Sequence, residues 1–142
     1  MIKSILTLLT FTSAFAFACP KLEGQYTCQY SDGSSDAVII SQKNENGTTV
    51  YSLGATEVIA DGKTHPVDQD DLKGTYIAQC AASSVNADVT GKVYDNGQPA
   101  ADVTMTIKVN KTTAGANIEQ SGEFKFGADV VPFEDKAICT LN

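Results

Sequence analysis

Arginine and tryptophan are absent from the chain, and histidine occurs once, at position 65. Acidic residues dominate instead, because seventeen Asp and Glu residues stand against ten Lys and give a formal net charge of −7. Nucleic acids and anionic membranes are bound mainly through cationic side chains. The composition therefore argues against nucleic acid and anionic membranes as partners, and the net charge favours solubility.

The residue spacings that mark metal and catalytic centres are also missing. A zinc site needs closely spaced cysteine pairs, whereas the four cysteines are far apart. His65 lies in the turn from Asp61 to Pro66, and the sequence offers it no nucleophile or acid as a partner. We therefore predict no catalytic residue, no metal and no cofactor, and we expect a protein that is not an enzyme.

Residues 1–18 have the pattern of a secretory signal peptide. Lys3 is followed by an uncharged run from Ile5 to Phe17, which is too short for a comfortable membrane span. Ala16-Phe17-Ala18 fits the small-residue rule of signal peptidase. We expect a secreted or periplasmic protein with Cys19 as its mature N-terminus. A lipid anchor on Cys19 is the less favoured alternative, because Ala16 stands where a lipobox usually has Leu or Val.

The mature residues 19–142 form one domain of ordinary size, and four cysteines in a secreted chain predict two disulfides. Three pairings are possible. The preferred one joins Cys19 to Cys28 and Cys80 to Cys139, which would pin the N-terminus to its own strand. The alternative joins Cys19 to Cys139 and Cys28 to Cys80, and the spacing alone leaves the choice open.

Short strands alternate with turn signals along the mature chain. Asn46-Gly47, Asp61-Gly62 and Asn96-Gly97 are dipeptides typical of hairpin turns. Apolar and polar residues alternate most clearly over 85–94 and 101–109, the pattern of strands with one dry face. No amphipathic helix of useful length follows the leader. The expected strands cover 22–30, the region of 38–40, 48–53, 56–60, a short segment ending at 67, 72–80, 85–94, 101–109, 118–126 and 136–141.

Two of these strands resemble each other. Leu22 to Tyr30 and Leu72 to Cys80 share Leu, Gly, Tyr and Gln at the same offsets, and each carries a cysteine on its tyrosine face. An apolar face that runs through consecutive hairpins must close on itself or pack against a second sheet. We predict an all-β fold, an antiparallel up-and-down β-barrel of about eight to ten strands. A β-sandwich is the alternative.

Gly24-Gln25-Tyr26, at the head of the first strand, resembles the Gly-x-Trp that opens the first strand of lipocalins and fatty-acid-binding proteins, the calycins. The chain departs from that pattern with Tyr in place of Trp, without the arginine that packs over it, and without the T-D-Y-type loop motif. The resemblance implies a barrel that binds a small ligand. Separately, Val89 to Val103 is similar to the paired strands that open carboxypeptidase-regulatory-like sandwich domains.

The leading hypothesis is a secreted, non-enzymatic barrel that binds a small apolar or amphipathic ligand. A barrel filled by its own side chains, acting as an interaction or inhibitor module in the envelope or outside the cell, is the rival. Gly91 and Gly122 interrupt the inner faces, and they mark either room for a ligand or bends in the sheet. The residues expected to face the interior and contact a ligand are Tyr26, Tyr30, Tyr76, Met105, Gln120, Phe124 and Phe126.

Overall fold

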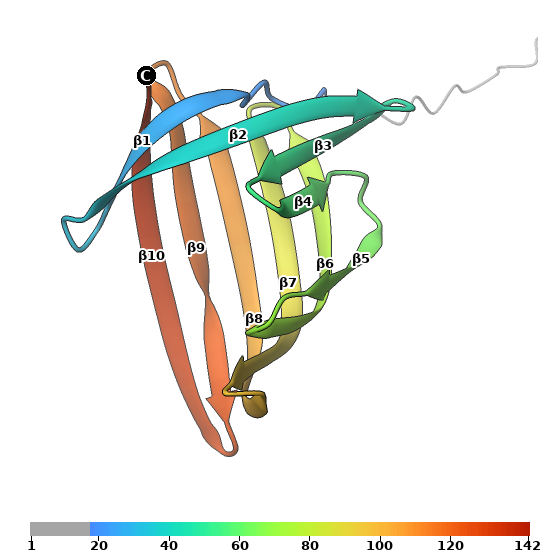
Figure 1. Ribbon diagram of the computed structural model, residues 1–142, viewed down its shortest axis with the longest axis vertical. Coiled ribbons are helices and arrows are strands. Elements are labelled where there is room, and N and C mark those ends of the chain that lie inside the picture. The colour runs from blue at the N-terminus through green and yellow to red at the C-terminus, as the bar shows by residue number, and fades with distance from the viewer. Residues whose placement is uncertain (1–17) are drawn as a thin grey trace, which may run out of the picture.

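The computed structural model describes residues 18–142 and forms one curved antiparallel sheet of ten strands (Figure 1). The predicted signal peptide, apart from Ala18, lies outside the described residues. The strands are β1 (Gly24–Tyr30), β2 (Ser35–Glu45), β3 (Thr48–Leu53), β4 (Thr56–Ile59), β5 (Thr64–Asp68), β6 (Leu72–Ala81), β7 (Ser84–Asp95), β8 (Gln98–Lys111), β9 (Gly115–Phe126) and β10 (Asp129–Leu141).

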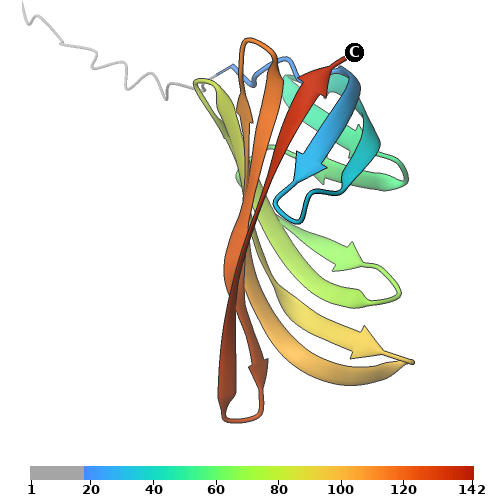
Figure 2. The same cartoon turned by 90° about the vertical axis from the view of Figure 1, so that its left-hand side faces the viewer.

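Every neighbouring pair of strands is antiparallel, and the order across the sheet is β4-β3-β2-β1-β10-β9-β8-β7-β6-β5. The first strand therefore pairs with the last, and the two free edges belong to β4 and β5, which follow each other in the chain. β1 to β4 cross over one end of the face formed by β5 to β10 (Figures 1 and 2). The sheet is a nearly closed barrel with one seam. The predicted barrel is confirmed, and the sandwich alternative is wrong.

The hairpins form where the sequence places its Asn-Gly dipeptides. Asn46 and Gly47 have φ values of 53° and 82°, and Asn96 and Gly97 have values of 49° and 77°. Positive φ at both central residues is the condition for a type I′ turn, whose twist matches that of the flanking strands. These turns connect β2 to β3 and β7 to β8.

The last strand is longer than the sequence predicts. β10 begins at Asp129 rather than at Lys136, and Asp129 to Thr140 pair with β9. Pro132 obscures this part of the strand in the sequence, because proline cannot donate a ladder hydrogen bond. The structure tolerates it because β1 pairs with β10 only from Ala137 to Leu141, so the earlier part of β10 has a neighbouring strand, β9, on one side only.

Two disulfides form, as predicted, but both pairings considered from the sequence are wrong. Cys28 is bonded to Cys139, and Cys19 is bonded to Cys80. Cys28 and Cys139 are direct partners in the β1–β10 ladder, so closure of the barrel brings their side chains together on the inner face. Two disulfides are compatible with an oxidising extracellular or periplasmic location. Because a sulfur atom in a disulfide cannot also carry a thioether-linked lipid, the Cys19–Cys80 disulfide and lipidation of Cys19 exclude each other.

The interior contains two groups of buried side chains. The upper core lies under β1 to β3 and contains, among others, Tyr26, Cys28, Ile40, Tyr51 and Cys139. Leu22, which precedes β1, is 3% exposed and belongs to the same core. The lower cluster is centred on Tyr76, Ala78 and Val89, with partly buried apolar neighbours from β4, β5, β6, β7 and β8. The upper core is filled by the chain's own N-terminal segment, and the lower cluster is not.

Candidate functional site

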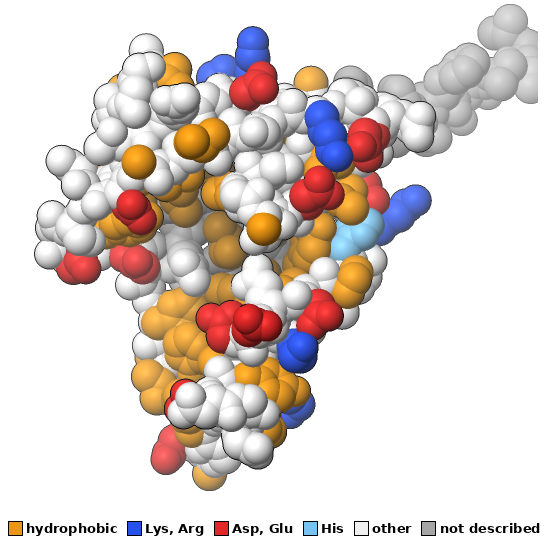
Figure 3. All heavy atoms as spheres, viewed as in Figure 1, with side chains coloured by type: hydrophobic (Ala, Val, Ile, Leu, Met, Phe, Trp, Pro, Cys, Tyr) orange, Lys and Arg blue, Asp and Glu red, His pale blue; other side chains and the backbone are white. Residues whose placement is uncertain are grey.

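A cavity of about 380 Å³ lies in the lower half of the barrel, between the β4–β5 seam and the inner faces of β6, β7 and β8. This volume is at the small end of the range for ligand pockets, which is about 300–1,000 Å³. Apolar side chains form most of the wall, and Figure 3 shows apolar surface in the hollow of this face. The inward-facing residues that line it are Thr56, Val58, Val67, Leu72, Tyr76, Ala87, Val89, Met105 and Ile107.

Strand register explains why these side chains converge. Directly opposed residues of an antiparallel ladder project to the same face, and Tyr76 opposes Val89, which in turn opposes Met105. Two residues along, and so on the same face, Ala78 opposes Ala87, and Ala87 opposes Ile107. Ala87 lines the cavity with a small side chain, whereas Ala78 is fully buried beside it.

The seam beside the cavity is held by side chains rather than by a ladder. The hydroxyl of Tyr76 accepts a hydrogen bond from the backbone N–H of Ile59 at 3.0 Å. The side-chain amide of Gln69 donates to the hydroxyl of Thr56 at 3.4 Å. Two contacts of this kind hold an edge far less firmly than pairing with a neighbouring strand does. We therefore expect a ligand to enter the cavity through the seam.

The charged side chains that line the cavity at the seam are acidic, and each is paired with a lysine outside the lining. Glu57 and Asp68 border the cavity from the outer sides of β4 and β5, and neither lysine nor histidine lines it. Lys73 lies 2.7 Å from Asp68, and its hydrogen bond holds the pKa of that carboxyl below its ordinary value. Lys43 lies 3.4 Å from Glu57. Both ion pairs are solvent-exposed, and each contributes little to stability.

The seven residues predicted to contact a ligand all lie on the inner face, but the structure distributes them over three places. Tyr76 and Met105 line the cavity, and the amide of Gln120 donates to the sulfur of Met105 at 3.2 Å. Tyr26 and Tyr30 belong to the upper core. Phe124 and Phe126 lie near the far end of β9, where Phe124 stacks on Phe133 at 4.7 Å between ring centroids.

Most of the cavity wall was missing from the predicted set. Val89 and Ile107 were recognised as members of alternating strands, yet nothing in the alternation separates the cavity wall from the rest of the inner face. Val58 and Val67 come from the two shortest strands, β4 and β5, whose pattern is weak. Their position becomes evident only once the seam is known to fall between those strands.

The N-terminal segment covers the upper core, and two buried tyrosine hydroxyls are bonded to it. Tyr26 donates to the carbonyl of Leu22 at 2.7 Å, and Tyr51 donates to the carbonyl of Pro20 at 2.6 Å. Tyr26 is 4% exposed and Tyr51 3%. Burial raises the pKa of Tyr51 to about 12 and also raises that of Tyr26. These two tyrosines therefore stabilise the fold and do not line the candidate ligand site.

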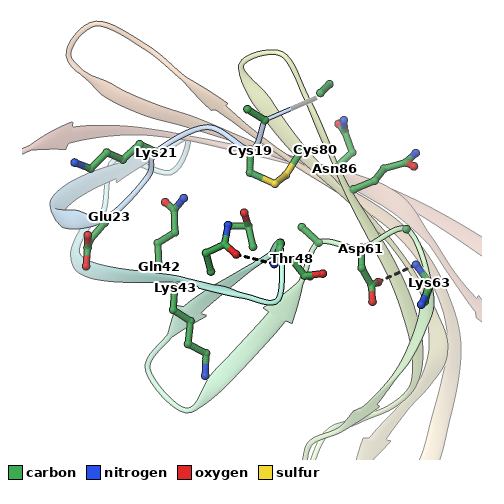
Figure 4. A pocket seen from close by; sticks show the side chains of 18 residues that line it. Cys19, Lys21, Glu23, Gln42, Lys43, Thr48, Asp61, Lys63, Cys80 and Asn86 are labelled. Carbon is green, nitrogen blue, oxygen red and sulfur yellow. Dashed lines mark hydrogen bonds between the residues drawn. A yellow bond between two sulfur atoms is a disulfide. The ribbon is translucent and has the colours of Figure 1, made fainter. Parts of the chain in front are cut away.

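A second, wider opening of about 1,220 Å³ lies at the upper end of the barrel, next to the start of the described chain. Figure 4 shows the Cys19–Cys80 disulfide at this opening, with Gln42, Thr48 and Asp61 around it. Polar and charged side chains and backbone turns supply much of its lining. Its lining is divided almost evenly between polar and apolar groups, whereas the lower cavity is mainly apolar, as small-molecule sites usually are, so the lower cavity is the stronger candidate.

Gly91 and Gly122 mark close approaches of strands rather than room for a ligand. A Cβ atom on Gly122 would lie 2.1 Å from the carbonyl oxygen of Thr104, and one on Gly91 would lie 2.4 Å from that of Lys73. Both distances are far shorter than a van der Waals contact. Of the two interpretations that the sequence allows, room for a ligand or a bend in the sheet, these distances favour the bend.

His65 faces the interior beside the cavity. Its Nε2 lies 2.9 Å from a carboxylate oxygen of Asp61, and its ring lies 5.4 Å from that of Tyr76 between centroids. This hydrogen bond is the main reason why the pKa of Asp61 is below its ordinary value. Within residues 18–142, no three His, Cys, Asp or Glu side chains are grouped as a metal site requires.

Comparison with protein-family models, with curated proteins and with solved structures found no match to this chain. In the described part of the chain, no helix has the length and apolar character needed to cross a membrane. The geometry of the barrel and its cavity therefore carries the functional argument.

Proposed function

We propose that this protein is a secreted, non-enzymatic, lipocalin-like barrel that binds a small apolar or amphipathic ligand in the cavity between the β4–β5 seam and β6 to β8. One observation carries the proposal: a space of about 380 Å³ with a mainly apolar wall, inside a fold whose other buried cluster is filled. Ligand sites combine such a wall with a few polar groups, and Tyr76, Thr56 and Gln69 supply them here.

The alternative is an interaction or inhibitor module that contacts another protein. A specific observation favours it: Phe126 and Val131, inner-face residues near the β9–β10 turn, are each 47% exposed. Contiguous exposed apolar surface often marks a binding site for a protein. The cavity remains the better-supported site because it has both depth and polar groups.

Uptake of a neutral fluorescent apolar probe, N-phenylnaphthylamine, tests the proposal. The wild-type protein is expected to bind one probe molecule with a blue-shifted emission, because the cavity excludes water. Ala87→Leu should abolish uptake, since the added carbons occupy the cavity. Folding of the variant is checked by its near-ultraviolet circular dichroism and its urea midpoint.

Thr90→Leu is the matched control. Thr90 lies on the same strand but on the outer face and is exposed, so the same leucine side chain introduced there should leave uptake unchanged. Failure of the folded wild-type protein to bind the probe, or equal uptake by Ala87→Leu, would refute the cavity as a ligand site. The interaction-module alternative would then take its place.

A further inference from the structure

The hydroxyl protons of the three most buried tyrosines have different destinations. Tyr26 and Tyr51 each donate to a backbone carbonyl of the N-terminal segment. The hydroxyl of Tyr76 instead accepts a hydrogen bond from Ile59. In the part of the chain that the structure describes, no acceptor takes the hydroxyl proton of Tyr76, although this residue is only 9% exposed.

A buried hydroxyl that accepts one hydrogen bond still has a donor to satisfy, and leaving such a donor unpaired costs free energy. Tyr76 lines the cavity. An oxygen atom of a bound molecule is well placed to accept this proton. The N–H of Ile59 fixes the hydroxyl from the side of β4 and so orients the donor before any ligand arrives.

The charged residues around the cavity restrict the class of ligand further. No cationic side chain lines the cavity. The two charged residues at its border, Glu57 and Asp68, are acidic, and the nearest lysines, Lys43 and Lys73, are already paired with them. A carboxylate placed here would lose its hydration and gain no cation, which is a large cost in an apolar site. Fatty acids in their ionised form are therefore poor candidates.

We propose that the cavity selects a neutral apolar molecule with a single oxygen acceptor, such as a ketone, aldehyde or ester, and that the hydroxyl of Tyr76 donates to that oxygen. This inference rests on the proposed function and specifies its ligand class. Tyr76 acts as the specificity-determining residue, and the apolar wall supplies most of the affinity.

The test compares methyl octyl ketone with decanoate, a pair with equal numbers of carbon atoms, as competitors of bound N-phenylnaphthylamine at pH 7.5. The ketone should displace the probe at concentrations at least tenfold lower than decanoate. Tyr76→Phe should weaken ketone binding about fivefold, the usual worth of one neutral hydrogen bond. Because N-phenylnaphthylamine has no oxygen to accept this proton, the loss of affinity for the ketone should exceed any loss of affinity for the probe.

Tyr26→Phe is the matched control, because it removes the same atom from the equivalent position of β1 without touching the cavity. A second measurement needs no variant: the carbonyl stretch of the bound ketone should shift to lower frequency than in an apolar solvent. This shift keeps the inference testable even if Tyr76→Phe does not fold.

The outcomes separate the two proposals. If decanoate competes as well as the ketone, or if the bound carbonyl shows no shift, the inference about ligand class is overturned while the cavity remains a ligand site. If neither the ketone, nor decanoate, nor the probe binds to the folded protein, the proposed function is overturned and this inference fails with it.

Discussion

Tyr26 on β1 and Tyr76 on β6 occupy the same place in two strands that repeat a Leu-x-Gly-x-Tyr pattern, yet their surroundings differ. Tyr26 is covered by the N-terminal segment and donates to the carbonyl of Leu22. Tyr76 borders a cavity and is tied only to the edge of β4. The comparison shows that the local sequence determines the strand and which residues face inward. Whether such a residue becomes part of the core or lines the cavity depends on what covers it.

The covering segment is short. Pro20 and Leu22 are both buried against the upper core, and the Cys19–Cys80 disulfide ties the start of the segment to β6. Within residues 18–142, no segment covers the lower cluster in this way, because that part of the barrel is bordered by the seam between β4 and β5. The upper core is therefore the filled half of the interior, and the lower half holds the space.

We expect the largest effect on stability from removing the disulfide in the upper core. Replacing Cys28 and Cys139 together by Ala removes a cross-link between residues 111 positions apart. We expect a loss of about 4–5 kcal/mol in the free energy of unfolding, since long closed loops restrict the unfolded chain most. Urea unfolding followed by circular dichroism measures it. Replacing Cys19 and Cys80, which are 61 positions apart, should cost somewhat less; a double variant of Cys28 and Cys139 as stable as the wild type would contradict the ranking.

A smaller effect is expected at the bend below the cavity. Gly122→Ala places a methyl group against the backbone of β8, and the resulting strain should lower stability by about 1–3 kcal/mol. Chemical denaturation checks the value, with Ser121→Ala on the exposed neighbouring position as the control. Unchanged stability, together with reduced probe uptake, would show that Gly122 lines open space after all.

The third prediction concerns alkaline pH. The pKa of Tyr51 is about 12 in the folded protein, against an ordinary value of about 10. Between these values the unfolded chain loses the tyrosine proton while the folded chain keeps it, so stability is fully present below pH ~10 and falls as pH rises. The slope should approach 1.4 kcal/mol per pH unit, roughly, for this one group.

Urea midpoints measured from pH 8 to pH 11.5 report this slope. Tyr51→Phe should lose about 1 kcal/mol at pH 8 through its missing hydrogen bond to Pro20, but its stability should depend less steeply on pH. Equal pH dependence in the variant and the wild type would show that Tyr51 is not the group responsible.

Much of this fold is predictable from the sequence because hairpins are local. Asn46-Gly47 and Asn96-Gly97 fix two turns, and alternation fixes the inner face of β7 and β8. The disulfide pairing was not predictable, because it depends on which strands meet when the barrel closes: β1 meets β10 only through a long-range ladder. Short strands such as β4 and β5 carry too little pattern to reveal that they are the free edges.

The candidate site was predictable only in part for the same reason. Tyr76 and Met105 could be assigned to the interior from alternation alone, and both line the cavity. Tyr26 satisfied the same criterion and proved to be core, because the segment that covers it precedes the strand and shows no periodicity. Sequence patterns identify the inner face, but they do not identify which part of it stays empty.

The central claim, that the lower cavity holds a small neutral ligand, is tested most directly by native mass spectrometry of the protein purified from its own source. The account predicts a polypeptide that begins at Cys19 and carries two disulfides, together with a small neutral adduct that is released on denaturation. The Ala87→Leu variant, expressed in the same source, should lack the adduct. An adduct-free wild-type protein that also fails to take up methyl octyl ketone in the same measurement would contradict the claim.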